Sequence, residues 1–217
     1  MNSKPFMQRS HIIYKHCGQH KPAKQEETDL FNFFTKSDDK TLEVEGVLLF
    51  DSRYFITSAK RPLKSPELLD INLPAGAEVP SPGSRVRFQI QKDSLTKTKP
   101  AQATAVEMEI ISEEPQNLSV NINTGVEMLE MIPENSHLLD ARSEGEYARG
   151  HIAGATLLPV QEIDKVADFV PDKSDVIMCY CGSGSRSATA ANKLRKMGYK
   201  IVIQLGGLNS YTGKLVS

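Results

Sequence analysis

The chain has 217 residues, of which 39% are hydrophobic and 24% charged, so it can bury one large core or two modest ones. Its formal net charge of −1 gives no global attraction to nucleic acid or to an anionic membrane. Three sparse cysteines, no apolar signal segment in residues 1–15 and no apolar run near ~18 residues predict a cytoplasmic protein without a membrane partner.

Residues 1–40 are expected to form a partly irregular N-terminal arm. Its aromatic-rich stretch 30–34 is expected to dock on the next domain, with an exposed partner patch as the alternative. A solvated arm is favoured over a metal site, because four potential zinc ligands fit no usual zinc-finger spacing: His11, His16, Cys17 and His20.

Residues 41–112 predict a small all-β domain. In residues 85–91, Val86, Phe88 and Ile90 alternate with polar residues and so share one face. Five short strands in about seventy residues favour a closed or nearly closed barrel. The expected strands are 44–50, 54–56, 68–73, 85–91 and a last strand that ends in 106–110.

The order of features in this part resembles a cold-shock-type OB domain. The resemblance is carried by residues 46–50 leading into 54–56, by 82–88 and by 99–106. In that family, aromatic residues on adjacent strands stack on single-stranded bases. Here the first aromatic motif is shortened, and residues 69–73 replace the second without offering a ring. Nucleic-acid binding and a module for packing or protein contact are both open.

A short acidic linker with a proline, residues 113–118, precedes a change of pattern. In residues 119–217 short apolar strands alternate with helices, which predicts an α/β domain with a central parallel sheet flanked by helices. The expected helices are 124–131, with Thr124 near its cap, 143–148, 161–169 and 187–197. The expected strands are 136–140, 155–158, 175–180 and 201–203.

Residues 176–188 place an apolar strand, a Gly/Ser loop and a helix start around Cys181. Backbone N–H groups of the loop and the positive end of the helix would lower the pKa of this thiol and favour bound anions. Gly182 and Gly184 let the loop curl with its N–H groups inward, and Arg186 adds a cationic fork. The alternative is a buried structural cysteine before an ordinary turn.

Four motifs in order, in residues 138–147, 150–155, 180–187 and 206–208, resemble the rhodanese (sulfurtransferase) homology domain over about residues 117–217. The resemblance implies that Cys181 takes a sulfane sulfur from a small donor such as thiosulfate and holds it as a persulfide. The sulfur then passes to a thiol, a cyanide-like or a protein acceptor, and no metal or organic cofactor is required. The implied residues are five that bind substrate and persulfide, Gly182, Ser183, Gly184, Ser185 and Arg186, and two that shape the edge of the site, Asp140 and Arg142.

One departure from the family concerns the donor. Many rhodaneses have Arg directly after the cysteine, where this chain has Gly182, so turnover with thiosulfate could be weak. Asp140 and Arg142 have a structural ion pair as an equal alternative. His151 lies in a turn and is expected to be structural.

Cys179 could serve as a resolving thiol for Cys181, since the two share a face of the strand. Positions i and i+2 of an extended strand are too far apart for easy bridging, so Cys179 is expected to be a buried apolar residue.

Two other functions compete with sulfur transfer. A cysteine phosphatase of the same fold has five residues between Cys and Arg, whereas four separate Cys181 from Arg186. A non-catalytic binding module or a persulfide carrier, RNA-associated through the OB-like domain, is the alternative from another class.

Overall fold

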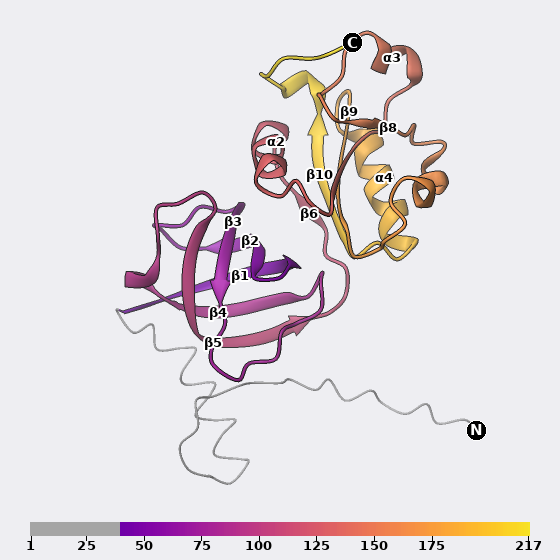
Figure 1. Cartoon of the computed structure of the whole chain (residues 1–217). Coiled ribbons are helices and arrows are strands. Elements are labelled where there is room, and N and C mark those ends of the chain that lie inside the picture. Colours follow the sequence, from indigo (N-terminus) through magenta and orange to yellow (C-terminus); the bar gives the residue numbers. More distant parts are fainter. Residues whose placement is uncertain (1–39) are drawn as a thin grey trace, which may run out of the picture.

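The computed structural model describes residues 40–217, which form a β domain and an α/β domain joined end to end (Figure 1). The expected arm, except for its last residue, lies outside the described residues, as do the aromatic stretch 30–34 and His11, His16, Cys17 and His20. Within residues 40–217, no helix has the length and apolar character needed to span a membrane.

The β domain is a five-stranded sheet that closes on itself. Its strands are hydrogen-bonded in the order β1-β2-β3-β5-β4, and β4 pairs back onto β1. Only β3 and β5 are parallel neighbours, so the sheet is mixed. Every strand overlaps a segment expected from the sequence: β1 (Thr41–Phe50), β2 (Arg53–Ala59), β3 (Glu67–Asn72), β4 (Arg85–Gln91) and β5 (Ala101–Ser112).

The interior of the β domain follows the alternation seen in β4. Val86, Phe88 and Ile90, which were predicted to share one face, are fully buried there, and Phe88 meets the ring of Tyr54 edge-on. A side-chain period of two puts one set of residues inside and leaves the other set to face outward.

The α/β domain contains a parallel sheet in the order β6-β10-β9-β7-β8, which confirms the predicted sheet type. The sequence missed β6, because a two-residue strand carries no pattern of its own. The strands are β6 (Leu118–Ser119), β7 (Ser136–Asp140), β8 (Thr156–Leu157), β9 (Val176–Cys181) and β10 (Ile201–Gly207).

The helices are α2 (Ile122–Met131), α3 (Glu144–Ala148) and α4 (Ser185–Lys196). Three expectations for the helical segments were wrong in detail. α2 begins two residues before 124, although Thr124 lies near the cap as predicted: its N–H donates to Oδ1 of the N-cap residue Asn121 at 3.0 Å. The segment expected to be a helix at 161–169 is the 3-10 helix η2 (Ile163–Asp168), and α4 begins two residues before 187.

Consecutive side chains of β9 face opposite layers of the domain. Met178 and Tyr180 point into the layer that contains α2, whereas Cys179 and Cys181 point toward η2 and α4. Buried parallel strands are covered on both faces, and the unbroken apolar run of β9 fits this position.

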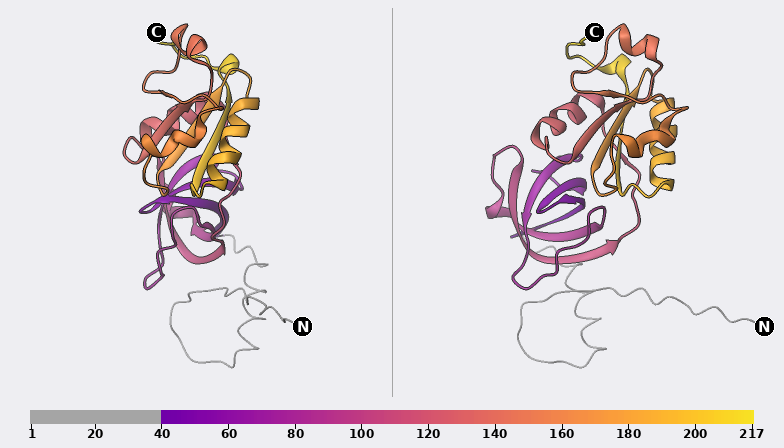
Figure 2. Two further views of the ribbon diagram at one scale, coloured as in Figure 1. Left: turned by 90° about the vertical axis from the view of Figure 1, so that its right-hand side faces the viewer. Right: turned by 45° about the vertical axis from the view of Figure 1, so that its right-hand side comes forward.

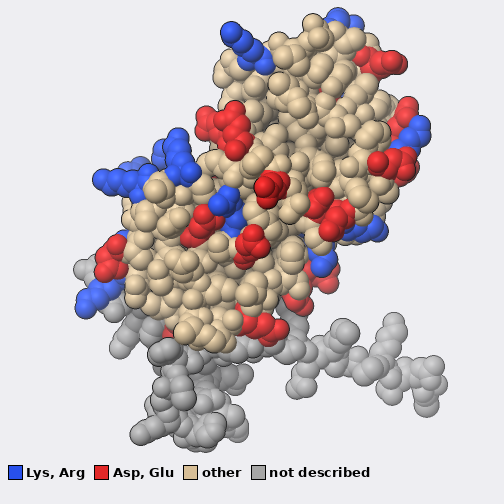
Figure 3. All heavy atoms as spheres, viewed as in Figure 1, with Lys and Arg blue, Asp and Glu red and all other residues tan. Residues whose placement is uncertain are grey.

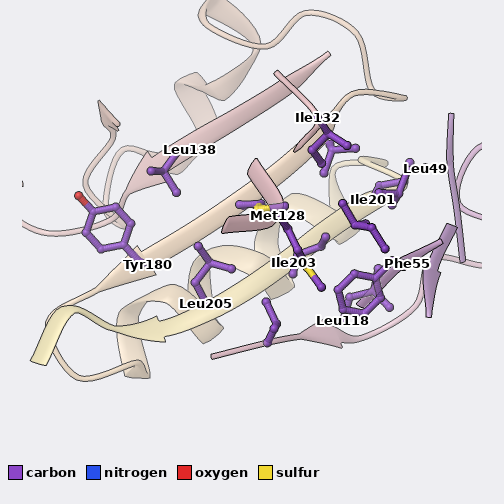
Figure 4. Packing of buried hydrophobic residues seen from close by; sticks show 14 of the residues in the cluster. Leu49, Phe55, Leu118, Met128, Ile132, Leu138, Tyr180, Ile201, Ile203 and Leu205 are labelled. Atoms are coloured by element: carbon purple, nitrogen blue, oxygen red, sulfur yellow. The ribbon is translucent and has the colours of Figure 1, made fainter. Parts of the chain in front are cut away.

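The two domains share an apolar core. Outward-facing Leu49 and Phe55 of the β domain lie beside Leu118 and Ile201 of the α/β domain (Figure 4). Arg53 adds a polar contact by donating to the Met131 carbonyl at the end of α2, at 2.8 Å. Two further views show the β domain seated against one end of the α/β domain (Figure 2). Burial on both sides of the contact makes the pair one packed unit.

Two rings of the aromatic motif at 54–56 are buried and cannot stack on bases. Phe55 is 2% exposed and lies in the shared core, and Tyr54 is buried inside the β domain. The shortened aromatic motif at 54–56 therefore offers no free ring. On the face seen in Figure 3, acidic and basic side chains are interspersed, without a continuous basic surface.

Candidate functional site

The loop that follows β9 turns directly into α4. Gly184, the N-cap of α4, has a left-handed φ of 107°, and it has no side chain that could cap the helix. The Gly184 N–H donates instead to Cys181 Sγ at 3.1 Å, and the N–H groups of Ser183 and Ser187 help to lower the pKa of this thiol. The Cys181 sulfur thus occupies the place of a capping acceptor.

The surroundings of Cys181 favour its thiolate form. Complete burial opposes ionisation, but the N–H groups of Ser187, Gly184 and Ser183 and the Ser187 hydroxyl outweigh it and lower the pKa of Cys181 below its usual value of 9.0. A lowered pKa raises the thiolate fraction at neutral pH, and the thiolate is the nucleophilic form.

Ser187 belongs to this site, although the sequence did not single it out. Its buried Oγ lies 3.7 Å from Cys181 Sγ and also within hydrogen-bond distance of the carbonyl oxygens of Gly184 and Gly206, at 2.9 and 3.1 Å. The hydroxyl therefore links the thiol, the loop and β10. Serine is common in the first turn of a helix, so the sequence alone does not indicate that Ser187 contacts the thiol; the distances in the structure do.

The end of β10 forms the platform on which the loop lies. A Cβ on Gly207 would come within 2.6 Å of the Gly182 carbonyl and within 2.7 Å of the Ser183 backbone. The Asn209 N–H donates to the same Gly182 carbonyl at 3.1 Å. Close backbone approach thus requires glycine at 207, and the left-handed φ of 82° favours glycine at 206.

Arg186 is not a free cationic fork. Its Nη1 and Nη2 donate to the two carboxylate oxygens of Glu146 in α3, at 2.6 and 2.8 Å. This hydrogen-bonded pairing lowers the pKa of Glu146 and raises that of Arg186, to which the nearby Cys181 thiolate also contributes. The two partners are 40 residues apart in the chain, so the sequence did not suggest the pair.

Asp140 and Arg142 form a buried ion pair, the structural alternative of the sequence analysis. Arg142 Nε lies 2.9 Å from both carboxylate oxygens of Asp140, and Nη2 lies 2.6 Å from Oδ2. Nη2 also donates to the Gly150 carbonyl at 2.8 Å, and the guanidinium lies over the Tyr180 ring. The pair thus anchors the 140–150 segment beside the sheet.

Two other residues have the surroundings expected for structural roles. Cys179 is a free, fully buried thiol, as predicted. His151 stacks on Tyr147, with its Nδ1 3.1 Å from the Tyr147 carbonyl. Among residues 40–217, no group of three His, Cys, Asp or Glu side chains is placed to hold a metal ion.

A cavity of about 510 Å³ lies beside β6 and β10, between the two domains. Pro66 of the β domain and Ser119, Gln204 and Gly207 of the α/β domain are among its lining residues, whereas Cys181 is not. The cavity therefore adjoins the platform under the loop rather than the thiol.

Comparison with known proteins matches residues 124–214 to the family model of the rhodanese-like domain. Thiosulfate sulfurtransferase PspE of Escherichia coli (strain K12) is 38% identical over 73 residues, which are 33% of this chain and 70% of that protein. The putative sulfur carrier protein YrkF of Bacillus subtilis (strain 168) is 38% identical over 82 residues, 37% of this chain and 44% of that protein.

One further curated protein and one solved structure are also similar to this chain. The tRNA sulfurtransferase of Thermoplasma acidophilum is 34% identical over 82 residues, 38% of this chain and 16% of that protein. The solved structure "rhodanese with anions from E. coli" is 35% identical and covers 38% of this chain and 98% of that chain, with a TM-score of 0.36. The chain spans less than half the length of YrkF and of the tRNA sulfurtransferase.

The match covers β7, β9, α4 and β10, including the cysteine loop and its platform. It leaves the β domain outside. Through residues 124–214, the chain belongs to the rhodanese-like domain family.

Proposed function

We propose that this protein is a sulfurtransferase in which Cys181 accepts a sulfane sulfur and carries it as a persulfide. The observation that carries the proposal is the hydrogen bond from the Gly184 N–H to Cys181 Sγ at 3.1 Å, which together with the N–H groups of Ser183 and Ser187 lowers the pKa of the thiol. The same donors that favour a thiolate would also hold a bound persulfide anion.

With thiosulfate as donor, the Cys181 thiolate attacks the outer sulfur. The new S–S bond forms as the sulfur–sulfur bond of thiosulfate breaks, and its electron pair leaves with sulfite. A thiolate, cyanide or protein acceptor then attacks the outer sulfur of the persulfide, and Cys181 regains its electron pair as a thiolate. Charge and atoms balance in both steps, and no cofactor takes part.

The other predicted residues divide into loop and support. Gly182, Ser183, Gly184 and Ser185 are proposed to form the persulfide cradle with their backbone. Arg186 stands at its edge, paired with Glu146. Asp140 and Arg142 act as positioning residues through their mutual pair, because neither has a polar contact with Cys181 among the bonds they form.

A cysteine phosphatase fits these observations less well. Only four residues separate Cys181 from Arg186, and the Arg186 guanidinium that would hold a phosphate is bound to Glu146. A carrier that delivers sulfur to one protein partner shares the same first step. YrkF is named a putative sulfur carrier protein, and its similarity to this chain supports this second candidate.

The β domain is proposed to be OB-like, which its strand order and single parallel pair support. A role in RNA-associated sulfur transfer rests on the domain pairing and on the tRNA sulfurtransferase relative. Because Phe55 is buried between the domains, any such contact would have to use another surface than the β1–β2–β3 face. A gel shift with single-stranded RNA at low salt tests this, and no shift would end the idea.

The proposed function is tested by the mass of the intact protein after incubation with a sulfane-sulfur donor. We expect the wild type to gain one sulfur atom and Cys181→Ser to gain none. Addition of cyanide should remove the sulfur as thiocyanate. Hydrolysis of a phosphate ester without any sulfur gain would reject the proposal in favour of a phosphatase.

A further inference from the structure

The mouth of the cysteine loop, where Gly182, Arg186 and Glu146 lie close together, has little net positive charge for a site that would take an anionic donor. The four residues between Cys181 and Arg186 carry no charge. Arg186 is bound to Glu146 through two short hydrogen bonds, so the carboxylate offsets the charge that Arg186 directs toward Cys181. The thiolate of Cys181 itself is negative, and backbone N–H groups of the loop and the Ser187 hydroxyl stabilise it.

Glu146 is fixed in this place. Its Oε2 accepts the Ser143 N–H at 3.1 Å and pairs with the Ser143 hydroxyl at 2.9 Å, which forms the capping box of α3. A Cβ on Gly182 would lie 3.2 Å from Arg186 Nη2 and 3.8 Å from Glu146 Oε1. The carboxylate therefore stands close to the residue that follows the nucleophile.

A thiosulfate dianion that approached this mouth would meet a thiolate and a fixed carboxylate, balanced by a single guanidinium. Like charges at such distances cost free energy unless further cations offset them. A persulfide carries at most one negative charge on its two sulfurs, and its leaving group is a monoanionic thiolate rather than sulfite. The charge balance of the mouth therefore suits a persulfide better.

We propose that Cys181 draws its sulfur from a low-molecular-weight alkyl persulfide, R–S–SH, in preference to thiosulfate. This rests on the proposed sulfurtransferase function and names the donor class. A small donor fits, because Cys181 is fully buried and a bulky group next to the reacting sulfur would hinder its approach.

The transfer is a simple thiol–disulfide-type exchange. The Cys181 thiolate attacks the terminal sulfur of R–S–SH, the S–S bond of the donor breaks, and its electron pair leaves on the thiolate R–S⁻. Cys181 then carries –S–SH, which loses its proton to solvent. No oxidant or reductant is consumed.

Gly182 makes the proposal testable, because the position tolerates a side chain. Its φ lies outside the left-handed region, and the nearest atom to an added Cβ is the flexible end of Arg186. Gly182→Arg restores a second cation at the mouth, and Gly182→Ala is its uncharged control. Glu146→Gln keeps an oxygen for the Ser143 N–H while it removes the competing negative charge.

The measured quantity is the ratio of two rates of one-sulfur mass gain at Cys181, with thiosulfate and with cysteine persulfide, in the full chain. Peptide mapping assigns the sulfur, and Cys181→Ser gives the background. We expect the wild type to load at most about 0.1 times as fast from thiosulfate as from cysteine persulfide. A tenfold difference corresponds to the loss of about one charge-assisted hydrogen bond. Gly182→Arg should raise the ratio about tenfold and Glu146→Gln by a smaller factor, whereas Gly182→Ala should keep the wild-type preference.

The outcomes distinguish a failure of the persulfide preference from a failure of the proposed sulfurtransferase function. If the wild type loads equally fast from both donors, or Gly182→Arg leaves the ratio where it was, the persulfide preference is overturned and sulfur transfer stands. If neither donor loads Cys181, both the preference and the proposed function fail.

Discussion

Cys179 and Cys181 lie two residues apart on β9, in the same layer and without exposed surface, and yet their surroundings differ. Around Cys179, the polar neighbours are carbonyl oxygens, those of Ser187 at 3.5 Å and Ile203 at 3.9 Å. Around Cys181, they are N–H groups and a hydroxyl. A carbonyl accepts the proton of a thiol, whereas an N–H stabilises the thiolate.

The pKa values follow these neighbours. Burial raises the pKa of Cys179 to about 12, and the charge of Arg195 offsets it only in part. Burial acts on Cys181 as well, but the N–H donors of the loop and α4 reverse its sign. The difference shows that the position at the strand end, next to a helix whose N-cap residue has no side chain, favours the thiolate at Cys181 rather than at Cys179.

The largest expected effect separates the two thiols by substitution. Cys181→Ser should reduce sulfur gain to the chemical background, while Cys179→Ala should keep it, because burial raises the pKa of Cys179 to about 12 and disfavours its thiolate. Intact mass after donor incubation measures both. A loss of sulfur gain in folded Cys179→Ala would mean that the two thiols act together.

The next prediction concerns pH. Alkylation by iodoacetamide should modify the Cys181 peptide with a midpoint below pH 9.0, because its folded-state pKa is lowered and the thiolate persists to lower pH. Cys179 should stay unmodified over the same range, since its pKa is raised to about 12. Peptide mapping after alkylation at a series of pH values gives both curves. Equal reactivity of the two peptides in the folded protein would contradict the comparison.

Ser187→Ala tests one of the groups that favour the thiolate. Loss of a hydrogen bond worth about 1 kcal/mol should raise the pKa of Cys181 by somewhat less than one unit and slow its alkylation at neutral pH by roughly three- to tenfold. Thr189→Ala is the matched control, because its exposed hydroxyl bonds to the Ser185 carbonyl on the same helix. A similar shift of the alkylation midpoint in both variants would assign the effect to the helix and not to the Ser187 hydroxyl.

The last prediction concerns stability and addresses the platform. Gly207→Ala forces a Cβ against the backbone of Gly182 and Ser183, so we expect it to lower the free energy of unfolding by about 1–3 kcal/mol and to displace the loop. Gly145→Ala, in α3 with open space around the new Cβ, should be neutral or slightly stabilising. Denaturant unfolding measures both. Equal stability of the two variants would show that the loop does not depend on the platform.

The sequence predicts those features that depend on residues close together in the chain. All strands of the described residues except β6, the parallel sheet and the cysteine loop follow from local periodicity and glycine placement. The sequence could not show that Arg186 binds Glu146, because this pairing requires α3 to dock beside the loop.

Burial by another domain was equally hidden. Phe55 looks in the sequence like an ordinary strand residue. It is buried only because the α/β domain packs against the outer face of the strand that contains it. The short strand β6 is likewise defined by its neighbour β10 rather than by its own residues. Long-range partners of this kind carry no signal within a single sequence.

The most direct test of the account is to locate the sulfur that a donor leaves on the protein. After incubation with cysteine persulfide and trapping of the product by alkylation, peptide mass spectrometry distinguishes a label at Cys181 from one at Cys179. The account predicts one added sulfur, on Cys181. An added sulfur on Cys179, or none on either residue in the folded wild type, would contradict it.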